Sequence, residues 1–307
     1  MRLSLSIASI RSHSLRIGNC TGTIRISSPA RPARRNARAL VLRRRYKGRH
    51  GTSPAIPKPA ASVLILRDGP DGLEVFMVLR SPELDFSSGA LVFPGGKVDP
   101  EDGDPALAAR ATGRFGERAR AHRIAAVREA FEETGVLLAR RAETMLPPED
   151  VGRIVARWRA GVHGGSVLFD SFLEAEDLVA DTAGLCHCAH WITPEHSARR
   201  FDVHFYLAAL PPGQDGSHDG SESVDSLWIR PETALRDAAE GNRPIMFPTR
   251  AILSRLARSG TVADALRRAE AEPVETVMTR VAATPGGRVL RIPRSAGYPM
   301  SELALDS

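Results

Sequence analysis

The stretch of sequence that decides the fold is residues 128–135, which read Arg-Glu-Ala-Phe-Glu-Glu-Thr-Gly. It closes a helix that we predict from Glu117 to Thr134, because Gly135 is a typical helix C-cap. At about 100° per residue, carboxylates at positions i, i+3 and i+4 share one helix face; these are Glu129, Glu132 and Glu133. The apolar side chains on the other side can anchor the helix in a core, and these are Ile124, Val127 and Phe131.

The crowding of three carboxylates on one face points to a cation. Such groups repel each other at neutral pH unless a positive charge lies among them, and hard oxygen ligands suit Mg²⁺ or Mn²⁺. A solvated acidic face is the plain interpretation of an isolated E-x-x-E-E pattern. Three neighbours favour a metal site here: Arg128 can orient a carboxylate, Gly135 ends the helix, and residues 93–96 (Phe-Pro-Gly-Gly) form a turn whose carbonyls can complete the metal shell.

This arrangement resembles the Nudix box, G-x5-E-x7-R-E-U-x-E-E-x-G-U, where U is a bulky aliphatic residue. Gly96 matches the first glycine, and residues 128–136 match the second half in order. The resemblance implies a metal-dependent hydrolase that cleaves a diphosphate bond, built as an α/β/α sandwich with a mixed sheet and a helical insert. It implies that the three glutamates and the Gly96 carbonyl hold Mg²⁺ or Mn²⁺. It assigns catalytic roles to Glu132 and Glu133, and to Arg128 as the residue that orients the cluster.

Two departures from the box stand in its first half. Six residues after Gly96 the chain has Asp102 instead of glutamate, with Glu101 beside it. Gly96 and Arg128 are 32 positions apart, so 18 residues are inserted relative to the box. The insert runs from residue 103 to about 121, and we expect it to extend the helix or to form a loop.

Upstream, the spacing of Arg80-Ser81, Gly89 and residues 93–96 resembles the coenzyme A diphosphatase signature, with Asp85 where that signature has a second arginine. Residues 199–202 and 247–250 also resemble segments of the long-insert branch of these Nudix proteins. The resemblance implies a small nucleotide-type substrate, with coenzyme A or acyl-CoA as the first candidate. ADP-ribose or NADH is the alternative within the enzymes, and a non-catalytic nucleotide sensor on the same fold is the alternative to them.

Further site residues are predicted outside the box. Arg80 can meet a substrate phosphate, and so can Arg199 and Arg200. Glu222, in the loop at residues 216–222, is the candidate for an additional base or ligand. The segment at residues 186–190, Cys-His-Cys-Ala-His, has the wrong spacing for a usual zinc site and alternates like a strand, so we expect no metal there.

The N-terminal segment has a composition unlike the rest of the chain. Residues 1–58 contain 14 of the 42 basic residues and no acidic residue, which leaves 28 basic against 36 acidic residues afterwards. We expect this segment to be disordered, with residues 53–61 as a linker. It resembles an organellar transit peptide, a nucleic-acid tail, or an upstream extension of a chain whose translation starts later. The Ala/Arg/Gly-rich composition suggests a bacterial source and hence a cytoplasmic location. A mitochondrial or peroxisomal location follows instead if residues 1–58 are a true targeting segment.

The remainder predicts one α/β (α+β) domain at residues 59–265 and a partly ordered tail at 266–307. Strands are predicted at residues 61–67, 73–80, 90–93, 186–192, 203–210, 224–229 and 287–292, with a turn at 68–72. Further helices are predicted at residues 149–161, 169–181, 231–240 and 249–259. No apolar stretch is long enough to cross a membrane. We expect no nucleic-acid partner for this domain, and a homodimer is compatible with the resemblance.

Overall fold

The computed structural model describes residues 55–82 and 89–305. The predictions for residues 1–54 and for Asp85 therefore lie outside the described residues. The linker prediction is wrong from residue 58 onward, because β1 (Lys58–Gly69) begins there and its first residues already pair with β9 (Phe201–Ala209).

A mixed sheet of eight strands forms the centre of the fold. Its order is β10-β2-β1-β9-β8-β11, with β3 beside β2 and β4 beside β1. The pairs β1·β9 and β8·β11 are parallel, and the other pairs are antiparallel. The remaining strands are β2 (Gly72–Arg80), β3 (Leu91–Val92), β4 (Gly95–Lys97), β8 (Cys186–Ile192), β10 (Ser223–Ile229) and β11 (Thr276–Met278).

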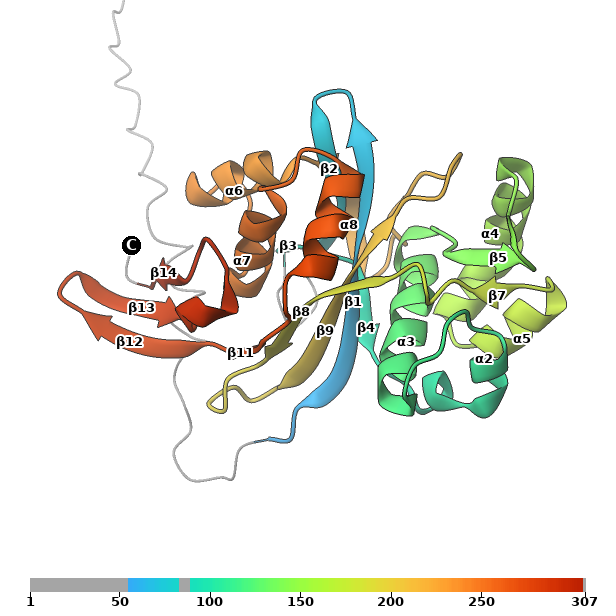
Figure 1. Cartoon of the computed structure of the whole chain (residues 1–307), viewed down its shortest axis with the longest axis horizontal. Helices are drawn as coiled ribbons and strands as arrows, with labels where there is room; N and C mark the ends of the chain where they lie inside the picture. The colour runs from blue at the N-terminus through green and yellow to red at the C-terminus, as the bar shows by residue number, and fades with distance from the viewer. Residues whose placement is uncertain (1–54, 83–88, 306–307) are drawn as a thin grey trace, which may run out of the picture. The chain divides into compact units, whose positions relative to one another are not determined.

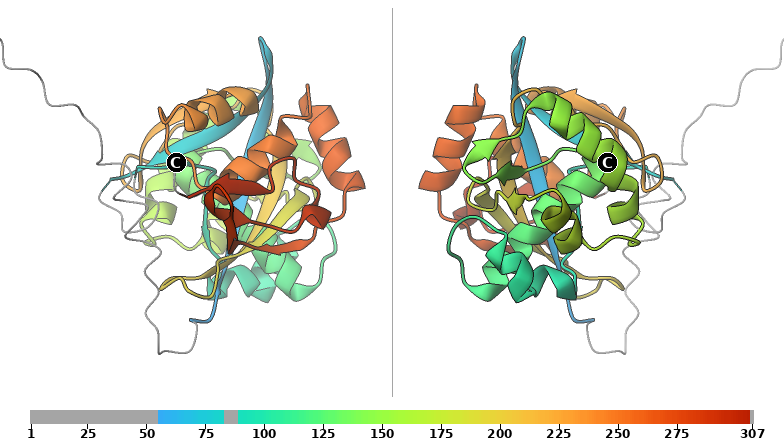
Figure 2. Two further views of the ribbon diagram at one scale, coloured as in Figure 1. Left: turned by 90° about the vertical axis from the view of Figure 1, so that its left-hand side faces the viewer. Right: turned by 90° about the vertical axis from the view of Figure 1, so that its right-hand side faces the viewer.

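Helices cover both faces of this sheet, as the sandwich prediction requires (Figures 1 and 2). On one face lie α3 (Glu117–Thr134), α4 (Pro148–His163) and α5 (Phe169–Ala175). On the other lie α6 (Pro231–Ala239), α7 (Phe247–Leu256) and α8 (Val262–Ala271). The predicted fold class is confirmed.

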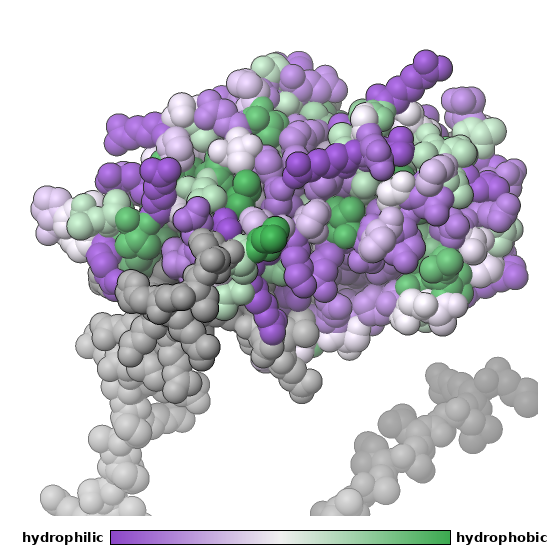
Figure 3. Space-filling model, turned by 90° about the horizontal axis from the view of Figure 1, so that it is seen from below, coloured by the Kyte–Doolittle hydropathy of each residue, from purple (hydrophilic) through white to green (hydrophobic). Residues whose placement is uncertain are grey.

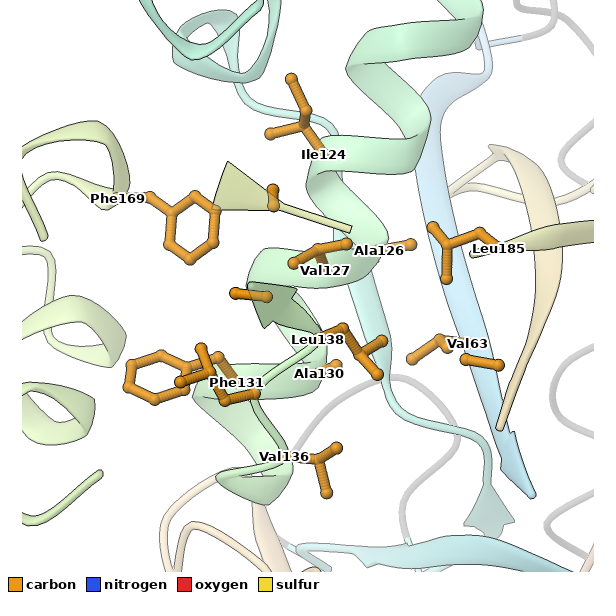
Figure 4. Close-up of a cluster of buried hydrophobic side chains, with 14 of the residues drawn as sticks. Val63, Ile124, Ala126, Val127, Ala130, Phe131, Val136, Leu138, Phe169 and Leu185 are labelled. Atoms are coloured by element: carbon orange, nitrogen blue, oxygen red, sulfur yellow. The ribbon is translucent and has the colours of Figure 1, made fainter. Parts of the chain in front are cut away.

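Strand β1 shows how the sequence builds two cores at once. Successive side chains of a strand point to opposite faces. Val63 and Ile65 therefore join the core under α3, while Leu64 and Leu66 join the core under α7. Figure 4 shows part of the first core, in which Val63 and Leu185 lie on one side of α3 while Phe131 and Phe169 lie on the other.

The insert predicted within the box forms a short helix followed by a loop. The 3₁₀ helix η1 (Pro100–Gly103) leads into α2 (Pro105–Ala109), whose N-cap Asp104 accepts a hydrogen bond from the Ala106 backbone N–H. The chain then continues as an extended segment to Gly116, the N-cap of α3. Both alternatives for the insert hold in part, because it forms a separate helix and also supplies the first turn of α3.

Two predictions of secondary structure are corrected. Residues 95 and 96 form β4 on the edge of β1, not only a turn. The helix predicted at 169–181 ends at Ala175, because Asp177 has a φ of 52° and Val179–Ala180 forms β7, which pairs with β5 (Ala139–Arg141). A second partner of β5 is β6 (Thr144–Met145).

The C-terminal region contains more structure than we predict. Helix α8 was missed; its N-cap Thr261 accepts a hydrogen bond from the Asp264 N–H. The predicted strand at 287–292 is β13 (Gly287–Arg291), and it lies between β12 (Arg280–Thr284) and β14 (Glu302–Ala304) in a separate sheet. Leu290 and Ile292 bury against the α7 side of the main sheet, so this sheet adds to the second core.

The surface of the described residues is polar on the face seen in Figure 3, where hydrophobic residues occur in small separate groups. No helix among the described residues is long and apolar enough to span a bilayer.

Replacing Phe131 tests the packing of α3. This side chain is fully buried and stacks on Phe172 with ring centroids 4.8 Å apart. We expect Phe131→Ala to lower the free energy of unfolding by about 3–5 kcal/mol in a denaturant titration, because it leaves a cavity. Val281→Ala, at a half-exposed position of β12, should change it by less than about 0.5 kcal/mol. Equal effects of the two changes would contradict this account of the core.

Candidate active site

The last turns of α3 bring the three predicted glutamates to the edge of the main sheet. Gly135 ends the helix in the left-handed conformation, with a φ of 70°, and its N–H donates to the Phe131 carbonyl. Because Phe131 is buried in the first core, the helix face that carries the glutamates is turned toward β4. Glu129 and Glu133 are buried there, and Glu132 is half-buried.

Strand β4 forms the opposite wall, and its two glycines allow a close approach. The Gly95 N–H donates to Glu133 Oε2 at 3.0 Å. A Cβ atom at Gly96 would collide with the carboxylate of Glu129, and one at Gly95 would collide with the Ala61 carbonyl. The backbone of β4 therefore lies directly against the carboxylates, which is where the Gly96 carbonyl was predicted to serve as a ligand.

Arg128 connects the parts of this site. Its Nε and Nη2 donate to the two oxygens of Asp102 at 3.0 and 2.9 Å, and Nη2 also donates to the Lys97 carbonyl at 2.9 Å. Its Nη1 donates to Glu129 Oε1 at 2.9 Å and to Glu132 Oε1 at 3.2 Å. The guanidinium thus holds η1, β4 and α3 together, and its role in orienting a metal cluster stays a prediction.

Asp102 was not among the predicted site residues. It is almost completely buried, and one of its oxygens also accepts from the Asp99 N–H at 2.8 Å. The sequence did contain the signal, since Asp102 stands six residues after Gly96, where the box has its first glutamate. Its shorter side chain still reaches Arg128 in a two-bond pair.

Burial makes the glutamates poor anions in the absence of a cation. It raises the pKa of Glu129 to about 7, against the opposing charge of Arg128. It raises the pKa of Glu133 well above the usual range, and the charge of Glu129 adds to this. The pKa of Glu132 is also raised by burial. Burial acts to lower the pKa of Arg128, but the bond to Asp102 and the glutamate charges raise it overall. A divalent cation beside these carboxylates would favour their charged forms.

The donor set fits a hard divalent cation, because it consists of buried carboxylate oxygens packed directly against the backbone of β4. Among the described residues, the group whose ligand atoms all lie within 4.8 Å of one another is a different one, His190, Asp202 and His204.

Two of the predicted residues outside the box lie close to the glutamates. Arg80 Nη2 is 3.8 Å from Glu222 Oε2, and the Ser81 N–H donates to the Glu222 carbonyl at 2.8 Å. The charge of Arg80 lowers the pKa of Glu133, whereas the charge of Glu222 raises it, so both side chains act electrostatically on the glutamate cluster. The Arg80 Nε is buried and has no hydrogen-bond partner among the described residues.

The other two predicted arginines are Arg199 and Arg200, and the hydrogen bonds of Arg200 go to residues outside the glutamate cluster. Arg200 is buried, and it donates through Nε to the Thr193 carbonyl at 2.9 Å and through Nη1 to the Ala55 carbonyl at 2.8 Å. The first bond ties the start of β9 to the end of β8, and the second ties it to the residues before β1. Arg199 is exposed. Their predicted contact with a substrate phosphate stays a prediction.

The comparisons with known proteins agree with this geometry. The family described as NUDT19 Nudix domain matches residues 108–256, which include Arg128 and the three glutamates. A solved structure, a Nudix hydrolase from Alicyclobacillus acidocaldarius, is 27% identical with a TM-score of 0.58, covering 69% of this chain and 96% of that one. The chain belongs to the Nudix hydrolase family. The matched range begins after Gly96 and Asp102, so the first half of the Nudix box is recognised here by its geometry.

Two curated Nudix relatives carry the name acyl-coenzyme A diphosphatase NUDT19. The protein from Gallus gallus is 28% identical, with 66% of this chain and 62% of the relative covered. The protein from Homo sapiens is 29% identical, with 68% of this chain and 65% of the relative covered. The chain thus matches somewhat less than two thirds of the length of these relatives.

The two glycines at positions 96 and 103 provide a matched test of the Nudix site. Gly96→Ala would push the Glu129 carboxylate aside while leaving the backbone in place, because the obstacle is the end of a flexible side chain. We expect the affinity for Mn²⁺ to fall by about 10–100-fold in a calorimetric titration. Gly103→Ala has no atom within 4 Å of its new Cβ and should bind like the unchanged chain. Unchanged affinity in Gly96→Ala would remove β4 from the metal site.

Proposed function

We propose that this chain is a divalent-metal-dependent diphosphatase that hydrolyses the diphosphate linkage of a nucleoside-diphosphate derivative, with coenzyme A or acyl-CoA as the substrate. The observation that carries the proposal is the buried Arg128 network, which fixes Glu129 and Glu132 beside β4, together with the Gly95 N–H, which holds Glu133 there. A solvated acidic helix face has no need of such a network, because exposed carboxylates are satisfied by water.

Mg²⁺ or Mn²⁺ is the proposed cofactor. When bound, such an ion neutralises diphosphate oxygens and makes a water molecule a better nucleophile. Glu129, Glu132 and Glu133, together with the Gly96 carbonyl, are the proposed ligands. Their oxygen donors suit these hard ions, and their raised pKa values mean that the unliganded cluster lacks a compensating charge.

The chain's own groups would position and polarise the reactants. Arg128 has its donors committed to Asp102, Glu129, Glu132 and the Lys97 carbonyl, so its role is to orient the ligands and not to bind substrate. Arg80 has a free Nε among the described residues and lies beside the cluster, so it is the proposed phosphate contact. Glu222 is the proposed general base, because its carboxylate is half-exposed and lies close to Glu133.

Coenzyme A is preferred as substrate because two lines of support agree. The residues around Arg80, Gly89 and 93–96 keep the spacing of the coenzyme A diphosphatase signature. The curated relatives named above are acyl-coenzyme A diphosphatases. Asp85, which replaces the second arginine of that signature, keeps ADP-ribose and NADH as the alternative substrates.

The decisive experiment compares substrates and one glutamate. The full chain is assayed with Mg²⁺ or Mn²⁺ against coenzyme A, acyl-CoA, ADP-ribose and NADH, beside Glu133→Gln. Glutamine resembles the protonated acid and can still accept from the Gly95 N–H, so the fold should survive. We expect coenzyme A to be cleaved to 3′,5′-ADP and a phosphopantetheine. In the variant, kcat/KM should fall at least about 100-fold, because several kcal/mol of charge stabilisation is lost.

The control is Glu143→Gln, an exposed carboxylate between β5 and β6, which should keep full activity. Preferred cleavage of ADP-ribose or NADH would preserve the mechanism and overturn the choice of substrate. Saturable nucleotide binding without metal-dependent cleavage would instead support a sensor and overturn the enzyme proposal.

Glu222→Gln tests the proposed base separately. If Glu222 removes a proton from the attacking water, kcat should fall by about 10²–10⁴-fold, and the acidic limb of the pH–kcat profile should disappear. The affinity for Mn²⁺ should stay unchanged, which distinguishes a base from a ligand. Glu232→Gln on α6 is the matched control. A pH profile identical to that of the unchanged chain would exclude Glu222 as the base.

A further inference from the structure

A second group of ligand side chains lies near the other end of α3. It borders a cavity of about 610 Å³ that is lined largely by histidine, arginine and aromatic side chains. Four histidines line it: His122 from α3, His187 and His190 from β8, and His204 from β9. His122 precedes Glu132 by ten residues, so at 1.5 Å per residue this group is roughly 15 Å from the glutamates along the helix.

Strand pairing places the group on one face of the sheet. His190 pairs with His204 across β8 and β9, and Asp202 lies two residues before His204 on the same face of β9. A regular strand would put His187 on the opposite face from His190. A β-bulge between His187 and Ala189 shifts the register and turns His187 toward His204 instead.

We propose that His190, Asp202 and His204 bind a divalent transition-metal ion of the zinc class, at a site separate from the glutamate cluster. One ligand atom from each residue lies within 4.8 Å of the other two. Two imidazoles and one carboxylate suit Zn²⁺ and its neighbours in the transition series, whereas Mg²⁺ prefers oxygen donors alone. This proposal departs from the expectation that residues 186–190 hold no metal, because the partners of His190 come from β9 and not from its own segment.

The ligands are already oriented by neighbouring groups. His190 Nδ1 is 2.8 Å from Thr276 Oγ1, which leaves Nε2 to face Asp202. The other oxygen of Asp202 accepts from Arg118 Nη2 at 2.7 Å. Histidine ligands of metals commonly have their second nitrogen fixed in this way.

His190 Nε2 and Asp202 Oδ1 share a hydrogen bond in the absence of an ion. Binding would replace that proton, which leaves to solvent, and the two atoms would move apart to about 3.3 Å around a tetrahedral ion.

His122 supplies an independent indication of a ligand. It is 97% buried, its Nδ1 bonds to the Arg118 carbonyl at 2.7 Å, and its Nε2 is buried without a partner among the described residues. Its ring lies 4.5 Å from that of His204, centroid to centroid. An unsatisfied buried nitrogen is destabilising, and coordination to an ion held by its neighbours would satisfy it.

The test measures bound metal, so it does not depend on hydrolysis. The full chain is dialysed against Zn²⁺ with excess Mg²⁺ to occupy the glutamate cluster, and retained zinc is counted by mass spectrometry. We expect one zinc ion per chain, lost in His190→Ala and in His204→Ala. His196→Ala, an exposed histidine between β8 and β9, is the matched control and should retain the ion.

Two further variants guard against a folding defect and against binding at the glutamates. Asp202→Asn is nearly isosteric and should keep the circular dichroism spectrum. It should weaken zinc binding by more than the roughly 10–100-fold that is typical when a residue only hydrogen-bonds to a metal ligand. Glu133→Gln should keep zinc while losing Mn²⁺. Zinc that is retained equally by His190→Ala, His204→Ala and the unchanged chain, or no zinc retained by the unchanged chain, would overturn the proposal.

Discussion

The pairing of Arg128 with Asp102 is the interaction on which the rest of the candidate site depends. Both side chains are almost fully buried, and their two-bond contact joins the C-terminal half of α3 to η1. Breaking a buried pair by removing one partner typically costs about 3–5 kcal/mol, because the other charge is left without compensation. The remaining donors of Arg128 reach Glu129, Glu132 and the Lys97 carbonyl, so one guanidinium sets the position of helix, turn and strand together.

This arrangement also explains how three buried carboxylates are tolerated. Arg128 supplies a positive charge to Glu129 and Glu132, while Glu133 receives only the Gly95 N–H. One arginine cannot balance Asp102 and three glutamates, and their raised pKa values express that imbalance. The carboxylates repel one another, and this repulsion would drive them apart. The packing of Phe131 on one side of the helix and the close approach of the β4 glycines on the other keep them in place.

Much of this could be predicted from the sequence because the signals were local. Helix α3 and its C-cap depend on residues close in sequence, and they were predicted at the observed bounds. Asp102 was not predicted as a site residue because it replaces the glutamate of the box, and its contact with Arg128, 26 residues away, is visible only in the structure. The end of α5 was missed because it depends on the pairing of β7 with β5, and the face of His187 because it depends on a bulge that only the partner strand defines.

The inserted residues show why the spacing of the motif in the sequence identifies this site less well than the contacts between its residues do. The two halves of the Nudix box are joined through space by Arg128 and Asp102, so the chain between them can lengthen without moving either end. In this protein the added length forms α2 and the start of α3, and residues 115–119 become one wall of the histidine-lined cavity. Arg118, which holds Asp202, belongs to that added length. The departure from the box that hides the Nudix site in a pattern search therefore also supplies one wall of the histidine-lined cavity and the arginine that holds Asp202.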